Sequence, residues 1–233
     1  KAAENDVKTW EDGGMFQNIS VFFIVELVGT VAFACSGAMV AIEKQLDLLG
    51  VIVLGVITAV GGGMIRDILI GIRPPSLFLN PVYVVAALIA VLILFFIMKF
   101  SGRCQDLLYS ELYEGMMNFM DAIGLGVFTV VGMDTAINAG YGDYRFLMIF
   151  LGVITGVGGG ILRDIMAVQT PYVLKKHIYA CASLAGALCY MLLLPRMDRD
   201  GAVVVSACLV VAIRVLARKY RWNLPRINRR NEK

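Results

Sequence analysis

Charged side chains, histidine and paired cysteines are all scarce in this 233-residue chain. Charged residues make up 17% of the sequence, whereas a soluble domain carries about 25%. The single histidine, His177, provides too few ligands for a metal centre and no set of partners for nucleophilic catalysis. The five cysteines include no Cys-X-X-Cys pair, which is typical of small buried residues. We therefore expect no enzymatic activity, no metal and no cofactor.

Apolar residues are abundant instead, at 59% of the chain, and they are gathered in long runs. A membrane-spanning helix needs about 20 predominantly apolar residues. Seven runs approach or exceed this length, and the last of them is the shortest. They cover Ile19–Ile42, Leu48–Ile72, Val82–Phe100, Met117–Ile137, Arg145–Met166, Ile178–Leu194 and Ala202–Leu216. The sequence predicts an all-α membrane protein with seven transmembrane helices.

The two ends of the chain differ in charge. Residues 1–18 form a polar N-terminal extension in which acidic and basic side chains are mixed. Basic residues dominate after the seventh run, in a tail at 217–233. Cytoplasmic segments carry an excess of Lys and Arg, and an odd number of spans places the two ends on opposite sides. We therefore expect a cytoplasmic C-terminus and an external N-terminus, with membrane lipids rather than nucleic acid as neighbours.

Two stretches of the chain are nearly identical. GVITAVGGGMIRD at Gly55–Asp67 returns as GVITGVGGGILRD at Gly152–Asp164. Each copy lies in the second of three spans, so the chain divides into repeats at 19–100 and 117–194, with a seventh helix at 202–216 outside the pattern. Because three is an odd number, the second repeat enters the membrane from the opposite side. We predict an inverted repeat, an arrangement found where solutes cross membranes.

Three consecutive glycines stand in the middle of each copy. They are Gly61, Gly62 and Gly63 in the first repeat and Gly158, Gly159 and Gly160 in the second. A glycine in a helix interior costs about 1 kcal/mol relative to alanine, so we predict that the second and fifth helices are broken at the triplets. Carbonyl groups freed at the two breaks would face each other near the midplane and attract a cation. Close packing of small residues is the alternative interpretation.

A threonine precedes each triplet on the same face of its helix. Thr58 and Thr155 lie three residues before the first glycine. Their hydroxyl groups either add oxygen ligands to a bound ion or bond back to a carbonyl of their own helix. The sequence leaves both interpretations open.

Each repeat also carries an acidic residue in its first span and an Arg-Asp pair after its glycines. Charges inside a membrane are costly and are usually paired. Similar depths in the membrane predict an ion pair between Glu26 and Arg66 and, by the repeat, one between Asp121 and Arg163. The alternative is that each arginine pairs with the aspartate beside it, Asp67 or Asp164.

The paired GGGxxRD motifs, at Gly61–Asp67 and Gly158–Asp164, lie within a plan of three, three and one helices. In this the chain resembles the prokaryotic trimeric intracellular cation channel (TRIC) family, whose bacterial sequences are also labelled as glycine-transporter domains. The resemblance implies a homotrimer in a prokaryotic cell membrane, with a pore in each subunit lined by two kinked helices. It also implies permeation of potassium, sodium and other monovalent cations. Only the glycines, arginines and aspartates of the two motifs carry over.

Two functions from different classes fit these residues. The first is a passive, potassium-favouring cation channel between the two glycine-containing helices. The second is a carrier for glycine or another small zwitterion, whose ammonium group would lie at the negative helix ends and whose carboxylate would meet Arg66 and Arg163. Ohmic current distinguishes the channel, and saturable uptake distinguishes the carrier. A membrane scaffold without transport is a third possibility.

Overall fold

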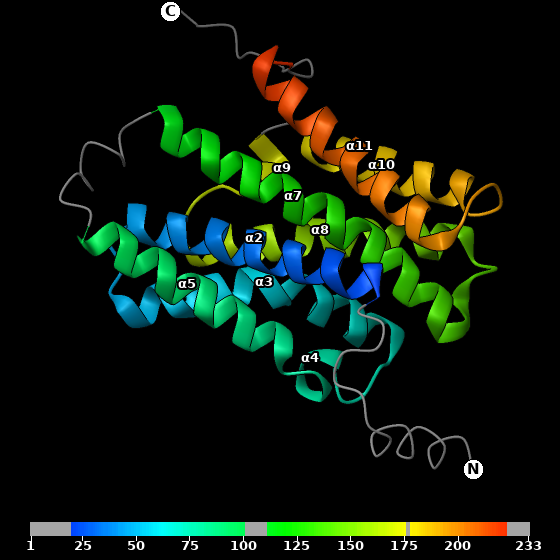
Figure 1. The fold of residues 1–233 in the computed structure, drawn as a ribbon, viewed down its shortest axis with the longest axis horizontal. Coiled ribbons are helices and arrows are strands. Elements are labelled where there is room, and N and C mark those ends of the chain that lie inside the picture. The colour runs from blue at the N-terminus through cyan, green and yellow to red at the C-terminus, as the bar shows by residue number, and fades with distance from the viewer. Residues whose placement is uncertain (1–19, 101–110, 176–177, 223–233) are drawn as a thin grey trace, which may run out of the picture.

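The computed structural model describes residues 20–100, 111–175 and 178–222 as a bundle of long helices whose axes run roughly side by side (Figure 1). The N-terminal extension and most of the basic tail lie outside the described residues, as does His177. Seven longer helices are α2 (Val21–Glu43), α3 (Leu48–Ile70), α5 (Val82–Phe100), α7 (Glu111–Ala136), α8 (Arg145–Met166), α10 (Ile178–Leu193) and α11 (Arg199–Lys219). Shorter elements are α4 (Ser76–Leu79), α9 (Tyr172–Lys175) and the π-helical turn η2 (Ile137–Tyr141).

Six helices in the described part of the chain are long and apolar enough to cross a membrane. The remaining apolar helix, α10, has 16 residues and is shorter than these six. The expectation that the last span is the shortest is therefore wrong, because α11 has 21 residues. Its first turn includes polar residues that the apolar run leaves out, and the Asp198 side chain caps it by accepting a hydrogen bond from the Gly201 N–H at 2.7 Å.

The predicted breaks in the second and fifth helices are also wrong. The structure contains α3 as one helix from Leu48 to Ile70 and α8 as one helix from Arg145 to Met166, and both run without interruption through their glycine triplets. In lipid, a backbone group that leaves its helix finds no water to replace the lost hydrogen bond. This cost outweighs the low helix propensity of glycine, which is measured in water.

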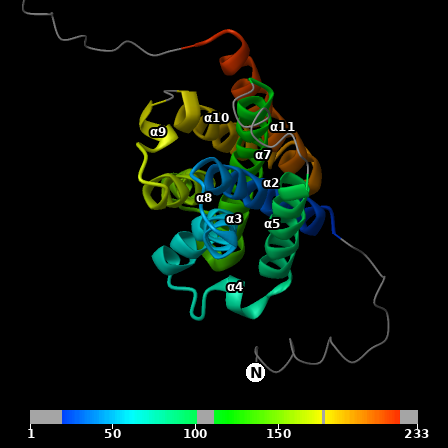
Figure 2. The same ribbon diagram turned by 90° about the vertical axis from the view of Figure 1, so that its left-hand side faces the viewer.

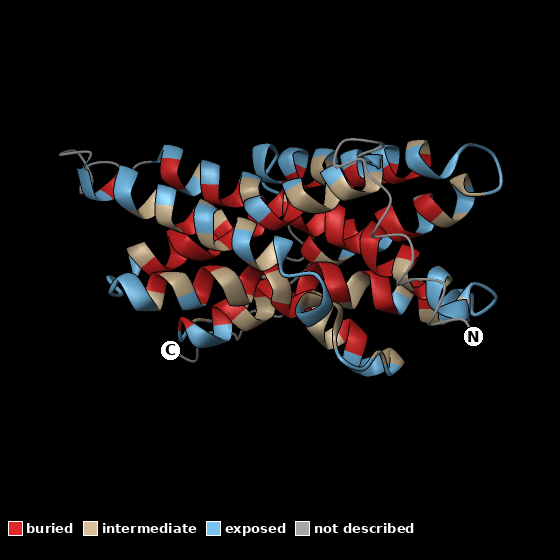
Figure 3. Cartoon of the chain, turned by 60° about the horizontal axis from the view of Figure 1, so that its bottom comes forward, coloured by how far each residue is buried: buried red, intermediate tan, exposed pale blue. Residues whose placement is uncertain are grey.

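The helices of the two halves correspond in order. Helices α2, α3, α4 and α5 match α7, α8, α9 and α10, whereas α11 packs against α7 and α10 and has no counterpart among the described helices. Helices α2, α3, α7 and α8 form the most extensive contacts of the bundle, and Figure 2 shows α2 and α3 near its centre with α5 to one side. Buried residues concentrate on these central helices, and the outer faces are exposed (Figure 3). The outward faces are rich in large apolar side chains, as lipid contact requires.

Equivalent residues of the two halves touch each other at the centre. Phe33 stacks on its counterpart Phe128, with ring centroids 5.3 Å apart. A Cβ on Gly158 would lie 3.1 Å from Cα of Gly62, and a Cβ on Gly62 would lie 3.2 Å from the backbone nitrogen of Gly159. Contacts between equivalent residues arise where a pseudo-two-fold axis passes through a molecule.

Candidate functional site

The glycine triplets form the crossing of α3 and α8. A Cβ on Gly62 would collide with the carbonyl oxygen of Thr155, and a Cβ on Gly159 would collide with the carbonyl oxygen of Thr58. Small residues allow membrane helices to approach this closely. The alternative interpretation of the triplets as close-packing residues therefore describes their contacts. With both helices intact, the triplets leave no ring of freed carbonyl groups for an ion.

The threonine hydroxyl groups bond back to their own helices. Thr58 donates to the Leu54 carbonyl at 2.6 Å, and Thr155 donates to the Leu151 carbonyl at 2.5 Å. Both side chains are buried against a glycine of the adjacent helix, Gly37 or Gly132. Of the two interpretations left open by the sequence, the geometry matches the back-bonded one.

The third glycine of each triplet lies beneath an arginine. A Cβ on Gly63 would be 3.7 Å from Nη2 of Arg66, and a Cβ on Gly160 would be 3.7 Å from Nη2 of Arg163. Helical side chains point towards the N-terminus and cover the residue three positions earlier. The spacing GGGxxR therefore provides room for a guanidinium group to fold back along its own helix.

The aspartate of each motif holds the segment that follows its helix. Asp67 accepts a hydrogen bond from Nε of Arg66 at 2.8 Å and another from the Ser76 N–H, at the start of α4, at 2.7 Å. Asp164 repeats both contacts, with Nε of Arg163 at 2.8 Å and the Tyr172 N–H, at the start of α9, at 2.7 Å. Each aspartate therefore neutralises its arginine and caps a short helix.

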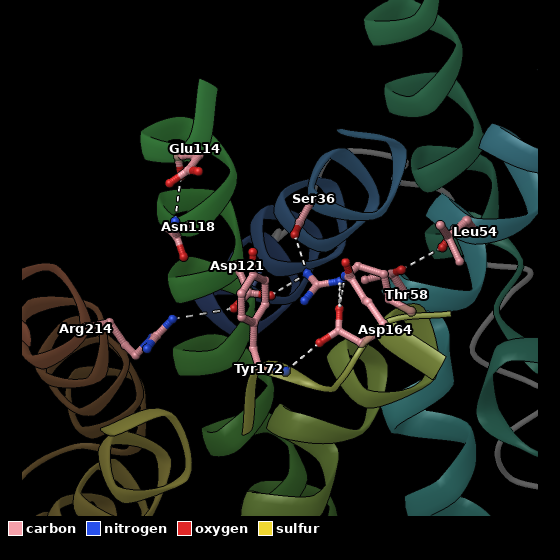
Figure 4. A network of polar contacts seen from close by, with 11 residues as sticks. Ser36, Leu54, Thr58, Glu114, Asn118, Asp121, Asp164, Tyr172 and Arg214 are labelled. Carbon is pink, nitrogen blue, oxygen red and sulfur yellow. Dashed lines mark hydrogen bonds and ion pairs between the residues drawn. The ribbon is translucent and has the colours of Figure 1, made fainter. Parts of the chain in front are cut away.

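Asp121 and Arg163 form a buried ion pair, as the repeat predicts (Figure 4). Nη1 of Arg163 lies 2.6 Å from Oδ1 of Asp121 and donates to Oγ of Ser36 at 2.6 Å. Nη2 of Arg214, on α11, lies 3.9 Å from Oδ2 of Asp121. Together with Asp164, the cluster contains two cations and two carboxylates. This balance is needed because the Arg163 side chain is 0% exposed and an unpaired charge there would be costly.

Aromatic rings complete this cluster. The guanidinium carbon of Arg214 lies 4.6 Å from the ring centroid of Tyr179, and that of Arg163 lies 5.5 Å from the ring centroid of Tyr172. Both distances allow cation–π attraction. Burial of Tyr172, which lies between two spans, raises its pKa to about 12, so this hydroxyl stays protonated at neutral pH.

The predicted ion pair between Glu26 and Arg66 is wrong. Among the described residues, the ion pair of Arg66 is with Asp67, whose Oδ1 lies 2.7 Å from Nη2 of Arg66. One carboxylate oxygen of Asp67 contacts Arg66, and the other accepts the N–H of Ser76 at the start of α4. Glu26 lies beside the Tyr83 hydroxyl instead.

A cavity of about 350 Å³ opens at the C-terminal end of α3, and we call it the α3-end cavity. Its lining includes both Glu26 and Arg66, and it reaches Ala59 and Gly63 at the helix crossing. A larger pocket of about 810 Å³ lies at the opposite ends of the spans, between α7 and α11, and we call it the α11 pocket. It reaches Arg214 and so approaches the Asp121 cluster. The two hollows therefore lie at opposite ends of the bundle, and the α3-end cavity is the one that reaches the helix crossing.

Several polar residues of these sites were missed by sequence reasoning. The sequence analysis assigns no partner to Arg214, although its position inside the apolar run Ala202–Leu216 is a signal of intramembrane pairing. Tyr83 and Tyr179 are each the second residue of the third helix in their repeat, and comparing the repeats could have found them. Ser36 has no such signal.

A second network joins the end of α7 to α11. Oδ1 of Asp134 accepts hydrogen bonds from the Tyr190 hydroxyl at 2.9 Å and from Nε of Arg199 at 2.5 Å. Nη2 of Arg199 also donates to the Asn138 side chain at 2.6 Å. The seventh helix is therefore tied to the second repeat at both of its ends, by Arg199 and by Arg214.

The fold and the site define a multi-pass α-helical membrane protein in which two central helices cross at glycine triplets and carry buried, paired charges. The family model described as Glycine transporter matches residues 23–99 and 118–195, and the chain belongs to this family. A membrane protein of Deinococcus radiodurans is 37% identical over 86% of this chain and 89% of its own length. The inner membrane protein YadS of Escherichia coli K12 is 38% identical over 70% of this chain and 74% of its own.

Solved structures of TRIC cation channels have the same fold. One, studied for conductance through these channels, has a TM-score of 0.76 and 34% identity, covering 91% of this chain and 99% of its own. The trimeric intracellular cation channel orthologue from Rhodobacter sphaeroides has a TM-score of 0.77 and 30% identity, covering 87% of this chain and 99% of its own. The likeness to prokaryotic TRIC channels drawn from the GGGxxRD motifs is thereby confirmed.

Proposed function

We propose that the protein is a passive channel for monovalent cations, favouring potassium over sodium, with one path in each subunit of a homotrimer. The observation that carries this proposal is the α3-end cavity, which extends from Glu26 to Ala59 and Gly63 at the crossing of α3 and α8. Similarity to TRIC cation channels over almost the whole chain supports it. Such a channel has no enzymatic step.

The proposed path runs between α3 and α8 in an inverted repeat. From one side an ion would enter the α3-end cavity and meet the carboxylate of Glu26. From the other side it would enter through the α11 pocket. The glycine crossing and the Asp121–Arg163 pair lie between the two hollows, and we infer that they narrow the path in this conformation. Movement of the crossing helices would open it.

Ion coordination in this proposal differs from the arrangement that broken helices would give. The carbonyl groups near Gly61 and Gly158 belong to continuous helices, and the hydroxyl groups of Thr58 and Thr155 are bonded to those helices. We assign the first contact of the cation to Glu26 instead. We also propose that the protein lies in the cytoplasmic membrane of a prokaryotic cell, with its basic C-terminal tail inside.

Purified protein in potassium-loaded liposomes tests the channel. We expect a potassium flux that is proportional to voltage and does not saturate with concentration over the millimolar range. A Glu26→Gln variant should reduce this flux, whereas Glu43→Gln, the same change at the exposed far end of α2, should not. Absence of any potassium flux from folded protein would contradict the proposal.

A carrier for glycine or another small zwitterion is the second candidate. One observation favours it: the α3-end cavity is lined by both a carboxylate, Glu26, and a guanidinium group, Arg66. A zwitterion placed there could contact both charges. Counterflow of labelled glycine in the same liposomes, with saturation and without unitary currents, would establish the carrier and exclude the channel.

A further inference from the structure

The two halves of the molecule contain matching acid–tyrosine pairs. In the second half, Asp121 lies near Tyr179, the second residue of α10. In the first half, Glu26 lies near Tyr83, the second residue of α5. The acids are equivalent in the repeat, and so are the tyrosines. The local surroundings of one pair therefore indicate what the other pair is built to accept.

In the second half, the cation beside this pair comes from the chain itself. The guanidinium carbon of Arg214 lies 4.6 Å from the ring centroid of Tyr179, and its Nη2 lies 3.9 Å from the Asp121 carboxylate. Arg214 belongs to α11, which has no counterpart in the described part of the first half (residues 20–100). Within the described residues, the first half thus has the acid and the aromatic ring but no helix that supplies the equivalent guanidinium group.

We propose that the α3-end cavity binds a small organic cation carrying N–H donors, of guanidinium or primary ammonium chemistry, between Glu26 and Tyr83. The proposal deepens the proposed channel function, because a ligand at this position would occupy the entrance to the path. The binding itself does not depend on conduction.

The charge of the cavity favours a cation. Arg66 and Asp67 both line it, but they form an ion pair with each other at 2.7 Å. Glu26 forms no ion pair among the described residues, so its ionised carboxylate would add a negative charge that the Arg66–Asp67 pair does not balance. A bound carboxylate would have to approach Arg66 beside Asp67, which already occupies Nε and Nη2, and like charges would repel. A cation is therefore preferred over a zwitterion.

Two threonine hydroxyl groups of the lining are left able only to accept hydrogen bonds. The Thr30 hydroxyl donates its proton to the Glu26 carbonyl at 2.8 Å, and the Thr135 hydroxyl donates to the Val131 carbonyl at 2.8 Å. Both hydroxyl groups line the cavity, and their remaining lone pairs can only accept. The rings of Phe22, Tyr83 and Phe128 also contribute to the lining. Acceptor oxygens and aromatic faces together suit an organic cation with N–H groups.

Direct binding tests the proposal on the full chain in lipid nanodiscs, with methylguanidinium as the probe and calorimetry as the measurement. We expect Glu26→Gln to weaken binding by about tenfold or more, because a charge-assisted contact is lost. The control Glu43→Gln should bind as the wild type does. Tyr83→Phe keeps the ring and should retain most of the affinity, whereas Tyr83→Leu should lose it. Thermal unfolding of each variant confirms that it is folded.

Three outcomes would overturn the proposal. The first is equal affinity of wild type and Glu26→Gln for methylguanidinium, and the second is that tetramethylammonium, which has no N–H donor, binds as tightly as methylguanidinium. The third is that glycine binds in a manner that depends on Glu26 while methylguanidinium does not bind. Potassium currents recorded with the probe on the Glu26 side should be blocked in wild type and in Glu43→Gln. Binding without any current leaves this inference standing and removes the channel, whereas current without binding does the reverse.

Discussion

Gly62 lies so close to the carbonyl oxygen of Thr155 that no methyl group fits between them, and Gly159 lies in the same way against Thr58. Both contacts belong to the crossing of α3 and α8, where the halves of the molecule meet. A crossing made of backbone against backbone has two properties. It is intolerant of added volume, and the space over its first glycines, Gly61 and Gly158, is filled by side chains of the opposite helix, Leu162 and Ile65.

Added volume at the crossing should destabilise the fold. We expect Gly62→Ala and Gly159→Ala each to lower the free energy of unfolding by about 1–3 kcal/mol, since the backbones must separate. Unfolding in mixed micelles measures this. The control is Gly142→Ala, where the new Cβ would meet only Ile137 at 3.8 Å. Equal stability of Gly62→Ala and the control would show that the close contact is not rigid.

The buried ion pair should behave as a coupled unit. Asp121→Asn leaves Arg163 with less negative charge around it, and we expect it to destabilise the protein by about 3–5 kcal/mol. Replacing both partners, as Asp121→Asn with Arg163→Gln, should cost less than the two single changes added together, with a coupling of about 0.5–3 kcal/mol. A double-mutant cycle measures the coupling. Strict additivity would mean that the two charges do not interact.

The threonine hydroxyl groups should not matter for conduction. Thr58→Val and Thr155→Val keep the side-chain shape and remove hydroxyl groups that are hydrogen-bonded to their own helices. We expect potassium flux in liposomes to stay within about twofold of the wild type, because loss of back-bonding leaves the helix intact. A large loss of flux in these variants, with normal unfolding, would return these oxygens to the list of ion ligands.

The contact of Arg199 should require a guanidinium group. Its Nε and Nη2 contact Asp134 and Asn138 separately, a fork that a lysine cannot reproduce. We expect Arg199→Lys to lower the free energy of unfolding by about 1 kcal/mol. Arg145→Lys, at an exposed arginine on α8, is the matched control. The same melting temperature for both variants would contradict this role.

Sequence patterns located the helices well but misjudged their continuity. The apolar runs placed α3, α5 and α8 within a few residues, because the hydrocarbon thickness of a membrane fixes the length of a span. The helix propensity of glycine, as measured in water, predicts a break at each triplet, whereas α3 and α8 are continuous there. The repeat correctly paired Asp121 with Arg163. It failed for Glu26, which lies beside the Tyr83 hydroxyl, although Arg66 and Arg163 contact the aspartates next to them in the same way.

The order of apolar runs and the duplicated GGGxxRD motif determined by themselves that this is a membrane protein of two similar halves, since both depend on local composition and spacing. Only the tertiary structure decided which charges meet, because partners such as Arg214 and Asp121 come from helices far apart in the chain. It also decided that the glycines pack rather than break. That outcome depends on a neighbouring helix lying close enough to fill the space that the absent side chains leave.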